Sequence, residues 1–255
     1  MTVTVDPVWG TAVFLLTLRL GALFVLSPIW GLASVPPSFR VLLLLAISAT
    51  LVSALPVKPA IVSDGGSLAA ASASELIVGA ILAFGVFAAF AVFSFAGKVL
   101  DVQVGFGLGN VFDPITHSQG PLIGAILSLL GVTLFFAIDG HHALLRGVAY
   151  SIEALPLGTP FASLPAAAVL KQFGVMFSLS LVLAAPALFC LLFVEAGLAV
   201  LSRNLPQMNL FIVAIPVKIF VGLAVLAASV AYLGPVAARV FASIFRYWES
   251  VLANG

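Results

Sequence analysis

The chain has 255 residues, of which 63% are hydrophobic and only 7% are charged. A soluble domain carries about 25% charged residues, so this chain could not cover a water-facing surface of its own and is expected to be an integral membrane protein. The net charge of +1 argues against a nucleic-acid partner, because phosphate binding requires clustered lysine and arginine.

Six apolar segments are close to the length of about 20 residues that a transmembrane helix needs. In chain order they are Val8–Ser27, Phe39–Leu55, Glu75–Leu100, Pro121–Ile138, Phe173–Leu201 and Leu210–Leu233. The third could project beyond a bilayer, and the sixth is expected to end at Gly234-Pro235. A further segment, Val236–Leu252, mixes charged and apolar residues and predicts an interfacial or protein-docked amphipathic helix. The predicted fold is therefore all-α: one polytopic membrane domain of helical hairpins, spanning residues 1–255.

The connections between these segments differ in character. Residues 55–74 and 151–168 are rich in proline, glycine and serine and predict exposed loops. The connection Asp101–Gly120 is rich in glycine and aromatic residues but poor in charge, which predicts a loop at membrane depth. Such backbone is tolerated there only where it is buried in protein or lines an aqueous cavity. Lysine and arginine are too evenly distributed to orient the chain in a membrane.

Arg19, Glu195 and Lys218 are ionisable residues inside apolar segments. Charge is costly at such positions and is therefore a first indication of function. Glu195 and Lys218 lie before and after the same turn, so they could pair across a hairpin, either to fix helix register or as part of an ion relay. The sequence identifies no partner for Arg19. We therefore expect the isolated chain to be unstable, since charges facing hydrocarbon would cost several kcal/mol.

Asp139, His141 and His142 form the cluster Asp-Gly-His-His. A zinc site needs three or four such ligands, and adjacent histidines on a helix point about 100° apart. The cluster is therefore interpreted as a structural polar cap at the end of the fourth span, without a metal.

Gly105, Gly107 and Gly109 alternate with apolar residues. Neither a Gly-Lys-Ser/Thr phosphate loop nor a strand–turn–helix setting for a dinucleotide accompanies them. A bendable apolar segment that packs across a pore and moves aside is the favoured interpretation. No Ser/His/Asp or Cys/His arrangement occurs at a recognisable spacing, so neither enzyme activity nor a cofactor is predicted. The small residues Gly120, Gly124 and Gly131 predict close helix packing, either within the chain or at a subunit interface.

Three motifs, taken in order, resemble the FliR/SctT family over nearly the whole chain. The first is Gln103-Val-Gly-Phe-Gly followed by Phe112-Asp-Pro114 and Gln119-Gly-Pro121. The second is Asp139-Gly-His141. The third is Glu195 followed by Arg203-Asn-Leu-Pro-Gln-Met-Asn209 and Pro216-Val-Lys218.

The resemblance implies a subunit of a bacterial type III protein-export gate in the inner membrane, at the flagellar basal body. Members of this family assemble with FliP-like and FliQ-like subunits and with FlhB into a closed helical pore for unfolded flagellar proteins, set largely above the bilayer plane. The family's plug loop corresponds to Gly105, Phe106, Gly107, Leu108, Gly109, Asn110, Val111, Phe112, Asp113, Pro114 and Gln119. The intramembrane polar or interface positions would be Arg19, Glu195, Arg203, Pro206, Gln207, Asn209 and Lys218.

Three alternatives remain open at this point. A secondary transporter of a small solute would use Arg19, Glu195 and Lys218. A membrane metalloenzyme would use Asp139, His141 and His142. A subunit of a virulence type III secretion system would share the motifs of the flagellar protein.

Overall fold

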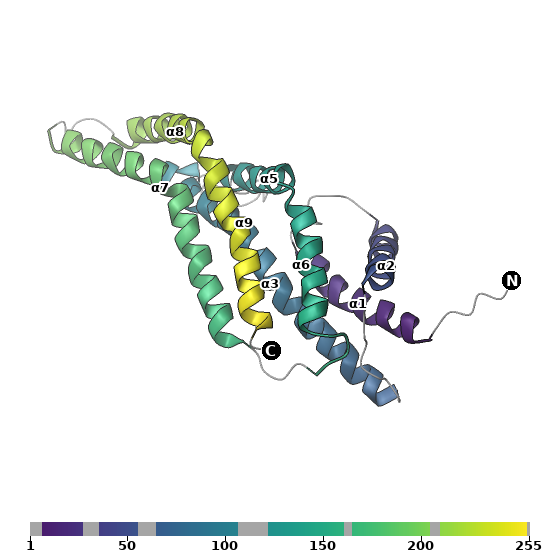
Figure 1. Ribbon diagram of the computed structural model, residues 1–255. Coiled ribbons are helices and arrows are strands. Elements are labelled where there is room, and N and C mark those ends of the chain that lie inside the picture. Colours follow the sequence, from purple (N-terminus) through teal and green to yellow (C-terminus); the bar gives the residue numbers. More distant parts are fainter. Residues whose placement is uncertain are drawn as a thin grey trace, which may run out of the picture. The chain divides into compact units, whose positions relative to one another are not determined.

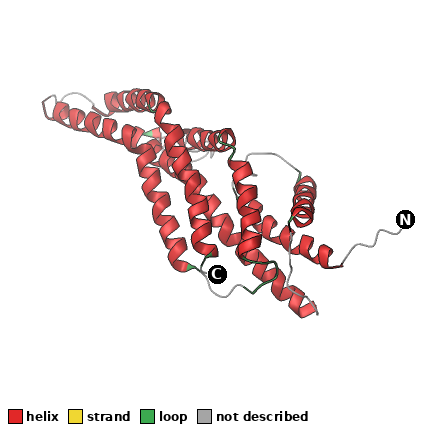
Figure 2. Ribbon diagram, viewed as in Figure 1, coloured by secondary structure: helices red, strands yellow, loops and turns green. Residues whose placement is uncertain are grey.

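A computed structural model of the chain describes residues 7–27, 36–55, 65–106, 122–160, 165–204 and 210–253. All regular secondary structure in these ranges is helical (Figures 1 and 2). The helices are α1 Pro7–Val25, α2 Pro37–Ala54, α3 Gly65–Val104, α5 Leu122–Ala137, α6 Gly140–Ala154, α7 Ala166–Asn204, α8 Leu210–Ala228 and α9 Val230–Leu252. The all-α prediction is confirmed.

Four of these helices, α1, α2, α3 and α7, are long and apolar enough to cross a membrane. The pairs α5–α6 and α8–α9 are each bent at a short break, and counting each pair as one span raises the number to as many as six. The six predicted spans agree with this upper count. At 1.5 Å per residue the 40-residue α3 is about 60 Å long, twice the thickness of a hydrocarbon core. A helix of this length must tilt strongly in a bilayer or project beyond it.

Several predicted boundaries are wrong, among them the start of α7, which lies at Ala166 instead of Phe173. Helix α3 begins at Gly65 rather than Glu75, because the alanine-rich stretch that precedes Glu75 favours helix despite its serines. It also continues to Val104, so Asp101 belongs to a helix and not to the following loop.

The sixth apolar segment ends at Ala228 instead of at Gly234-Pro235. Pro235 lies inside α9, in its second turn, so the helix lacks one N–H donor there but continues past it. The break falls at Ser229, whose hydroxyl donates to the carbonyl oxygen of Val225 at 2.7 Å. Helix α6 was not predicted at all, because its two histidines, one arginine and one glutamate interrupt the apolar pattern.

The chain forms two compact units. Unit 1 contains residues 1–88, 139–173 and 242–255, and unit 2 contains residues 89–138 and 174–241. Helices α3, α7 and α9 each contribute residues to both units.

In unit 1 the last turns of α9 dock on the first half of α3. The Tyr247 hydroxyl donates to the carbonyl oxygen of Ile81 at 3.1 Å, and the Trp248 indole N–H donates to that of Leu82 at 2.9 Å. Gly85 permits this approach, since a Cβ there would lie 2.6 Å from Cδ1 of Tyr247. Of the two settings expected for the C-terminal amphipathic segment, interfacial or protein-docked, these contacts favour the second, and its helix begins at Val230 rather than at Val236.

In unit 2 the core is a cluster of phenylalanine rings. Phe135 lies 5.4 Å from Phe90 and 5.1 Å from Phe241 between ring centroids, and Phe93 stacks on Phe241 at 5.7 Å. Gly131 makes room for this cluster, because a Cβ there would lie 2.8 Å from the Phe93 ring. Gly131 therefore serves packing within the chain, one of the two roles predicted for it.

Candidate functional site

Arg19 of α1 is almost fully buried and bonds to three segments of unit 1. Its Nε and Nη2 atoms donate to the two carboxylate oxygens of Glu75 at 2.6 and 3.1 Å. Nη1 donates to the carbonyl oxygen of Ser151 at 2.9 Å, and Nη2 also donates to that of Leu155 at 3.0 Å. Glu75 in turn accepts the Gly158 N–H at 2.8 Å. Arg19, for which the sequence identified no partner, is therefore paired with Glu75 and fully hydrogen-bonded, as a buried charge must be.

A glycine brings the helices that carry this ion pair together. Gly79 lies one turn after Glu75, and a Cβ there would be 2.4 Å from the carbonyl oxygen of Arg19. Sequence reasoning missed Glu75, although a signal was present: it is the only charged residue between Asp64 and Lys98. A single acid in so long an apolar stretch indicates a specific counter-charge elsewhere in the fold.

In unit 2, Asp101 ties the end of α3 to the start of α5. Its Oδ1 accepts the Ile123 N–H and its Oδ2 accepts the Gly124 N–H, both at 2.9 Å. These are donors of the first turn of α5, which have no acceptor within their own helix, and a carboxylate also matches the positive end of the helix dipole. Gly97 completes the contact, because a Cβ there would lie 2.4 Å from the Gly124 Cα. Asp101 was not singled out from the sequence, because its partners are backbone groups.

The hairpin of α7 and α8 in unit 2 carries the second ion pair. Lys218 donates to the Glu195 carboxylate, and the two side chains are 21% and 38% exposed. The ion pair that the sequence suggested is confirmed. Arg203 lies in the last turn of α7, where a cation is favoured by the helix dipole. Pro206, Gln207 and Asn209, which connect the two helices, lie outside the described residues.

Only the first two positions of the predicted plug are described. Gly105 follows the last turn of α3, donates to the Asp101 carbonyl oxygen at 3.1 Å and has φ 103°, a conformation that favours glycine. Phe106 follows it. The remaining plug positions lie outside the described residues: Gly107, Leu108, Gly109, Asn110, Val111, Phe112, Asp113, Pro114 and Gln119.

Asp139, His141 and His142 meet at the start of α6 in unit 1. Asp139 has φ 57°, and its Oδ1 lies 3.4 Å from Nδ1 of His142. The expectation that the two histidine rings point apart is wrong, because their centroids are 4.1 Å apart. The potential ligand atoms of all three residues lie within 4.8 Å of one another. Asp139 and His142 are 75% and 59% exposed, so solvent competes at this cluster. Its assignment as a structural polar cap stays a prediction.

The chain consists of long apolar helices whose buried charges are paired, and the Asp101 carboxylate links α3 to α5. These features define it as a polytopic α-helical membrane protein. Within this class, the model of a family described as bacterial export proteins, family 1, matches residues 11–244. The chain belongs to that family.

Named relatives agree with this assignment. The flagellar biosynthetic protein FliR of Bacillus subtilis is 28% identical over 246 residues, which cover 95% of each chain. FliR of Escherichia coli is 28% identical over 247 residues, which cover 96% of this chain and 94% of the relative. The Yop proteins translocation protein T of Yersinia pestis is 29% identical over 164 residues, which cover 63% of each chain. The resemblance to the FliR/SctT family is confirmed.

Proposed function

We propose that the chain is a pore-forming subunit of the flagellar type III protein-export gate in the bacterial inner membrane. The observation that carries the proposal is the family match over residues 11–244, in a chain built of long apolar helices. In this role it helps to conduct unfolded flagellar proteins and performs no chemistry of its own. FliP-like and FliQ-like subunits and FlhB are its proposed partners.

The extent of the similarity favours a flagellar role over a virulence role. The alignments with FliR of Bacillus subtilis and Escherichia coli cover 95% and 96% of this chain, whereas those with the Yop translocation protein T and with the surface presentation of antigens protein SpaR of Shigella sonnei cover 63% and 78%. Expression in flagellated cells that lack their own FliR tests this choice. Restored motility and flagellin export are expected. Export restored only in a virulence-system strain would assign the chain to the paralogous system.

Within the gate, we propose that the segment from Gly105 to Pro121 closes the pore. Its alternating glycine and apolar residues suit a segment that packs across an opening, and Phe106, Leu108 and Phe112 would exclude water and ions by dewetting. The two hydrogen bonds from the Ile123 and Gly124 N–H groups to the Asp101 carboxylate, here called the Asp101 clamp, support this role. They join α3, before the segment, to α5, after it, and would hold these helices fixed while the segment moves.

Replacing residues 107–121 by a short Gly-Ser linker tests the plug. Asp101, Ile123 and Gly124 are kept, so the base of the segment is unchanged. Cells that contain the assembled gate should then leak ions and grow poorly at high external salt. The control is a segment as short as the Gly-Ser linker that keeps the apolar residues of the native sequence. An assembled gate with the Gly-Ser linker and normal membrane permeability would contradict the assignment.

A further inference from the structure

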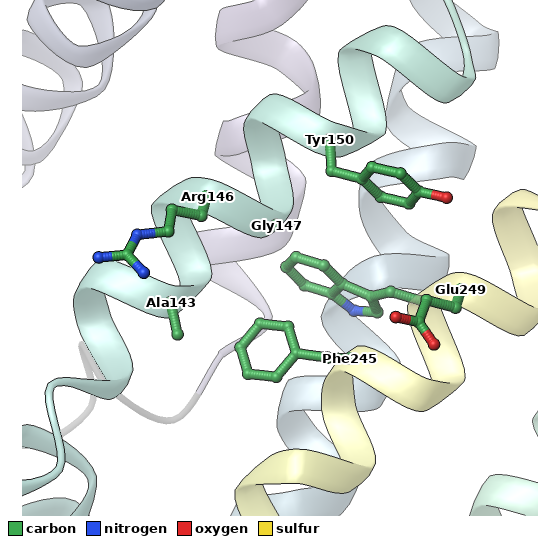
Figure 3. Close-up of a pocket in the computed structure, with 7 residues that line it drawn as sticks. Ala143, Arg146, Gly147, Tyr150, Phe245 and Glu249 are labelled. Carbon is green, nitrogen blue, oxygen red and sulfur yellow. The ribbon is translucent and has the colours of Figure 1, made fainter.

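A cavity of about 260 Å³ in unit 1 lies between α6 and the end of α9 (Figure 3). Its lining includes Tyr150 from α6, and Phe245, Trp248 and Glu249 from α9. The Phe245 and Trp248 rings meet edge to face, with centroids 5.9 Å apart. The cavity thus combines aromatic rings with one carboxylate.

The aromatic walls are held in place from outside the cavity. The Trp248 indole N–H donates to the Leu82 carbonyl oxygen at 2.9 Å, which fixes the orientation of the ring. Gly147 accommodates the ring on the α6 side, because a Cβ there would lie 2.5 Å from Cζ3 of Trp248. The pocket is therefore already formed in the single chain and does not depend on a ligand for its shape.

Glu249 gives the pocket a negative charge that the described residues do not neutralise. Its exposed carboxylate has no ion-pair or hydrogen-bond partner among them. It lies in the last turn of α9, a turn without a basic residue, where the helix dipole disfavours an anion. The faces of the aromatic rings are also negative and attract cations. Helix dipole, carboxylate and rings all favour a positively charged occupant.

Arg146 also lines the pocket but does not supply the missing cation. Figure 3 shows its side chain pointing away from the Tyr150 ring, whereas Tyr150 and Glu249 extend into the space between the two helices. Arg146 and Glu249 form no ion pair. A zwitterionic lipid head group would need an anion site beside the cation site, and the direction of Arg146 does not provide one.

We propose that this pocket binds the arginine or lysine side chain of a neighbouring protein subunit. The charged end of that side chain would meet the Glu249 carboxylate, and its methylene stem would lie against Phe245 and Tyr150. The inference rests on the proposed function, since it requires that the chain work inside a multi-subunit assembly.

A photoreactive benzoylphenylalanine at Tyr150 tests the occupant in cells that contain the full assembly. We expect a crosslink to a protein segment with an arginine or lysine next to the crosslinked residue. The same probe at Leu170, an exposed position of unit 1, controls for non-specific capture. A crosslink to phospholipid, to a segment without a basic residue, or to nothing would overturn the proposal.

Charge variants then test the role of Glu249. We expect Glu249→Gln to lower the crosslink yield about fivefold to tenfold, because it removes the opposite charge that the bound cation would meet at the interface. Glu153→Gln is the matched control, because it makes the same change at an exposed position of α6 that does not line the pocket, and it should change the yield by less than about twofold. Glu249→Arg should abolish the crosslink, and an acidic residue at the identified partner position should restore it. An unchanged yield with Glu249→Gln, or no rescue by the swapped pair, would reject the pocket.

Co-purification separates the two proposals. If the wild-type chain fails to co-purify with any other subunit, the proposed function fails. If it co-purifies but the Glu249 variants behave like wild type, only the pocket proposal fails.

Discussion

Arg19 and Glu75 show how one chain satisfies charges inside apolar helices. Each side chain is 1% exposed, and together they accept or donate hydrogen bonds to three further backbone groups. A buried ion pair gains little over an apolar pair, but removing one partner leaves an uncompensated buried charge. The pair therefore acts mainly to specify which segments meet.

We expect Arg19→Met and Glu75→Gln each to destabilise the chain by about 3–5 kcal/mol. The double variant Arg19→Met/Glu75→Gln should be closer to wild type than either single one, because it leaves no unpaired charge. Thermal unfolding in detergent ranks the stabilities of the wild type, the two single variants and the double variant. Additive losses in the double variant would contradict this account.

The half-exposed pair Glu195–Lys218 provides the comparison. Its side chains are 38% and 21% exposed, so the protein encloses this ion pair less than it encloses Arg19–Glu75, where each side chain is 1% exposed. Glu195→Gln should therefore lower the unfolding temperature less than Glu75→Gln does. A larger drop in unfolding temperature for Glu195→Gln than for Glu75→Gln would mean that burial does not determine how much the loss of an ion pair destabilises the chain.

The Asp139, His141 and His142 cluster should hold no stoichiometric metal. Its potential ligand atoms are close enough, within 4.8 Å, but two of the three side chains are more than half exposed and not fixed by further bonds. Elemental analysis of the purified protein is the measurement. One zinc ion per chain that survives chelator treatment and is lost in His142→Ala would refute the prediction.

At the scale of the elements, glycines decide how closely helices approach. Gly97 of α3 faces Gly124 of α5 at a distance that leaves no room for a Cβ, whereas a Cβ at Gly174 of α7 would have no other atom within 4 Å. Gly97→Ala should therefore separate α3 from α5 and strain the Asp101 clamp.

We expect Gly97→Ala to lower the unfolding temperature, and Gly174→Ala to leave it unchanged or raise it. In the second case alanine gains about 0.5–1 kcal/mol over glycine in a helix interior without a clash. Differential scanning fluorimetry of the two variants measures both shifts. Equal effects would show that helix propensity, not close approach, controls stability at Gly97.

Most helices could be predicted from the sequence, because a long apolar run is a local property. The same is true of the Glu195–Lys218 pair, whose members flank one turn. Glu75 and Asp101 could not be given their roles, since the partners of Glu75 lie on α1 and after α6, and those of Asp101 are backbone N–H groups of another helix. Helix α6 was missed because its stability comes from packing of Leu144, Val148 and Ile152, not from an apolar run.

At the scale of the whole molecule, the reason to expect partner subunits changes. Arg19, Glu195 and Lys218, the charges on which that expectation rested, are paired within the chain, so they no longer support it. Large apolar side chains support it instead. On α7 and α8 of unit 2, Phe189, Phe193 and Phe220 are 64%, 74% and 75% exposed. The 39-residue α7 is about 58 Å long, so a bilayer that it crosses upright would leave part of its apolar surface without lipid, and a partner subunit could cover that part.

Co-expression with FliP-like and FliQ-like subunits should therefore turn an aggregating or degraded protein into a discrete complex. Native mass spectrometry should show one copy of the chain in each complex. Phe193→Ser and Phe220→Ser should weaken this assembly, while Phe14→Ser on α1 of unit 1, at 47% exposure, is a comparison outside that surface. A stable monodisperse monomer that ignores those subunits would contradict both the prediction and the proposed function.

The contacts of Arg19 also constrain how the chain is made. Glu75 follows Arg19 by 56 residues, and Leu155 follows it by 136. At a synthesis rate of about 5–20 residues per second, the first partner emerges roughly 3–11 s after Arg19 and the last roughly 7–27 s after it. Until then α1 carries a bare guanidinium and gains little by leaving the insertion machinery for lipid. Ribosome-arrested chains that stop before Glu75 should therefore crosslink from α1 to that machinery, and chains that extend beyond Leu155 should release it.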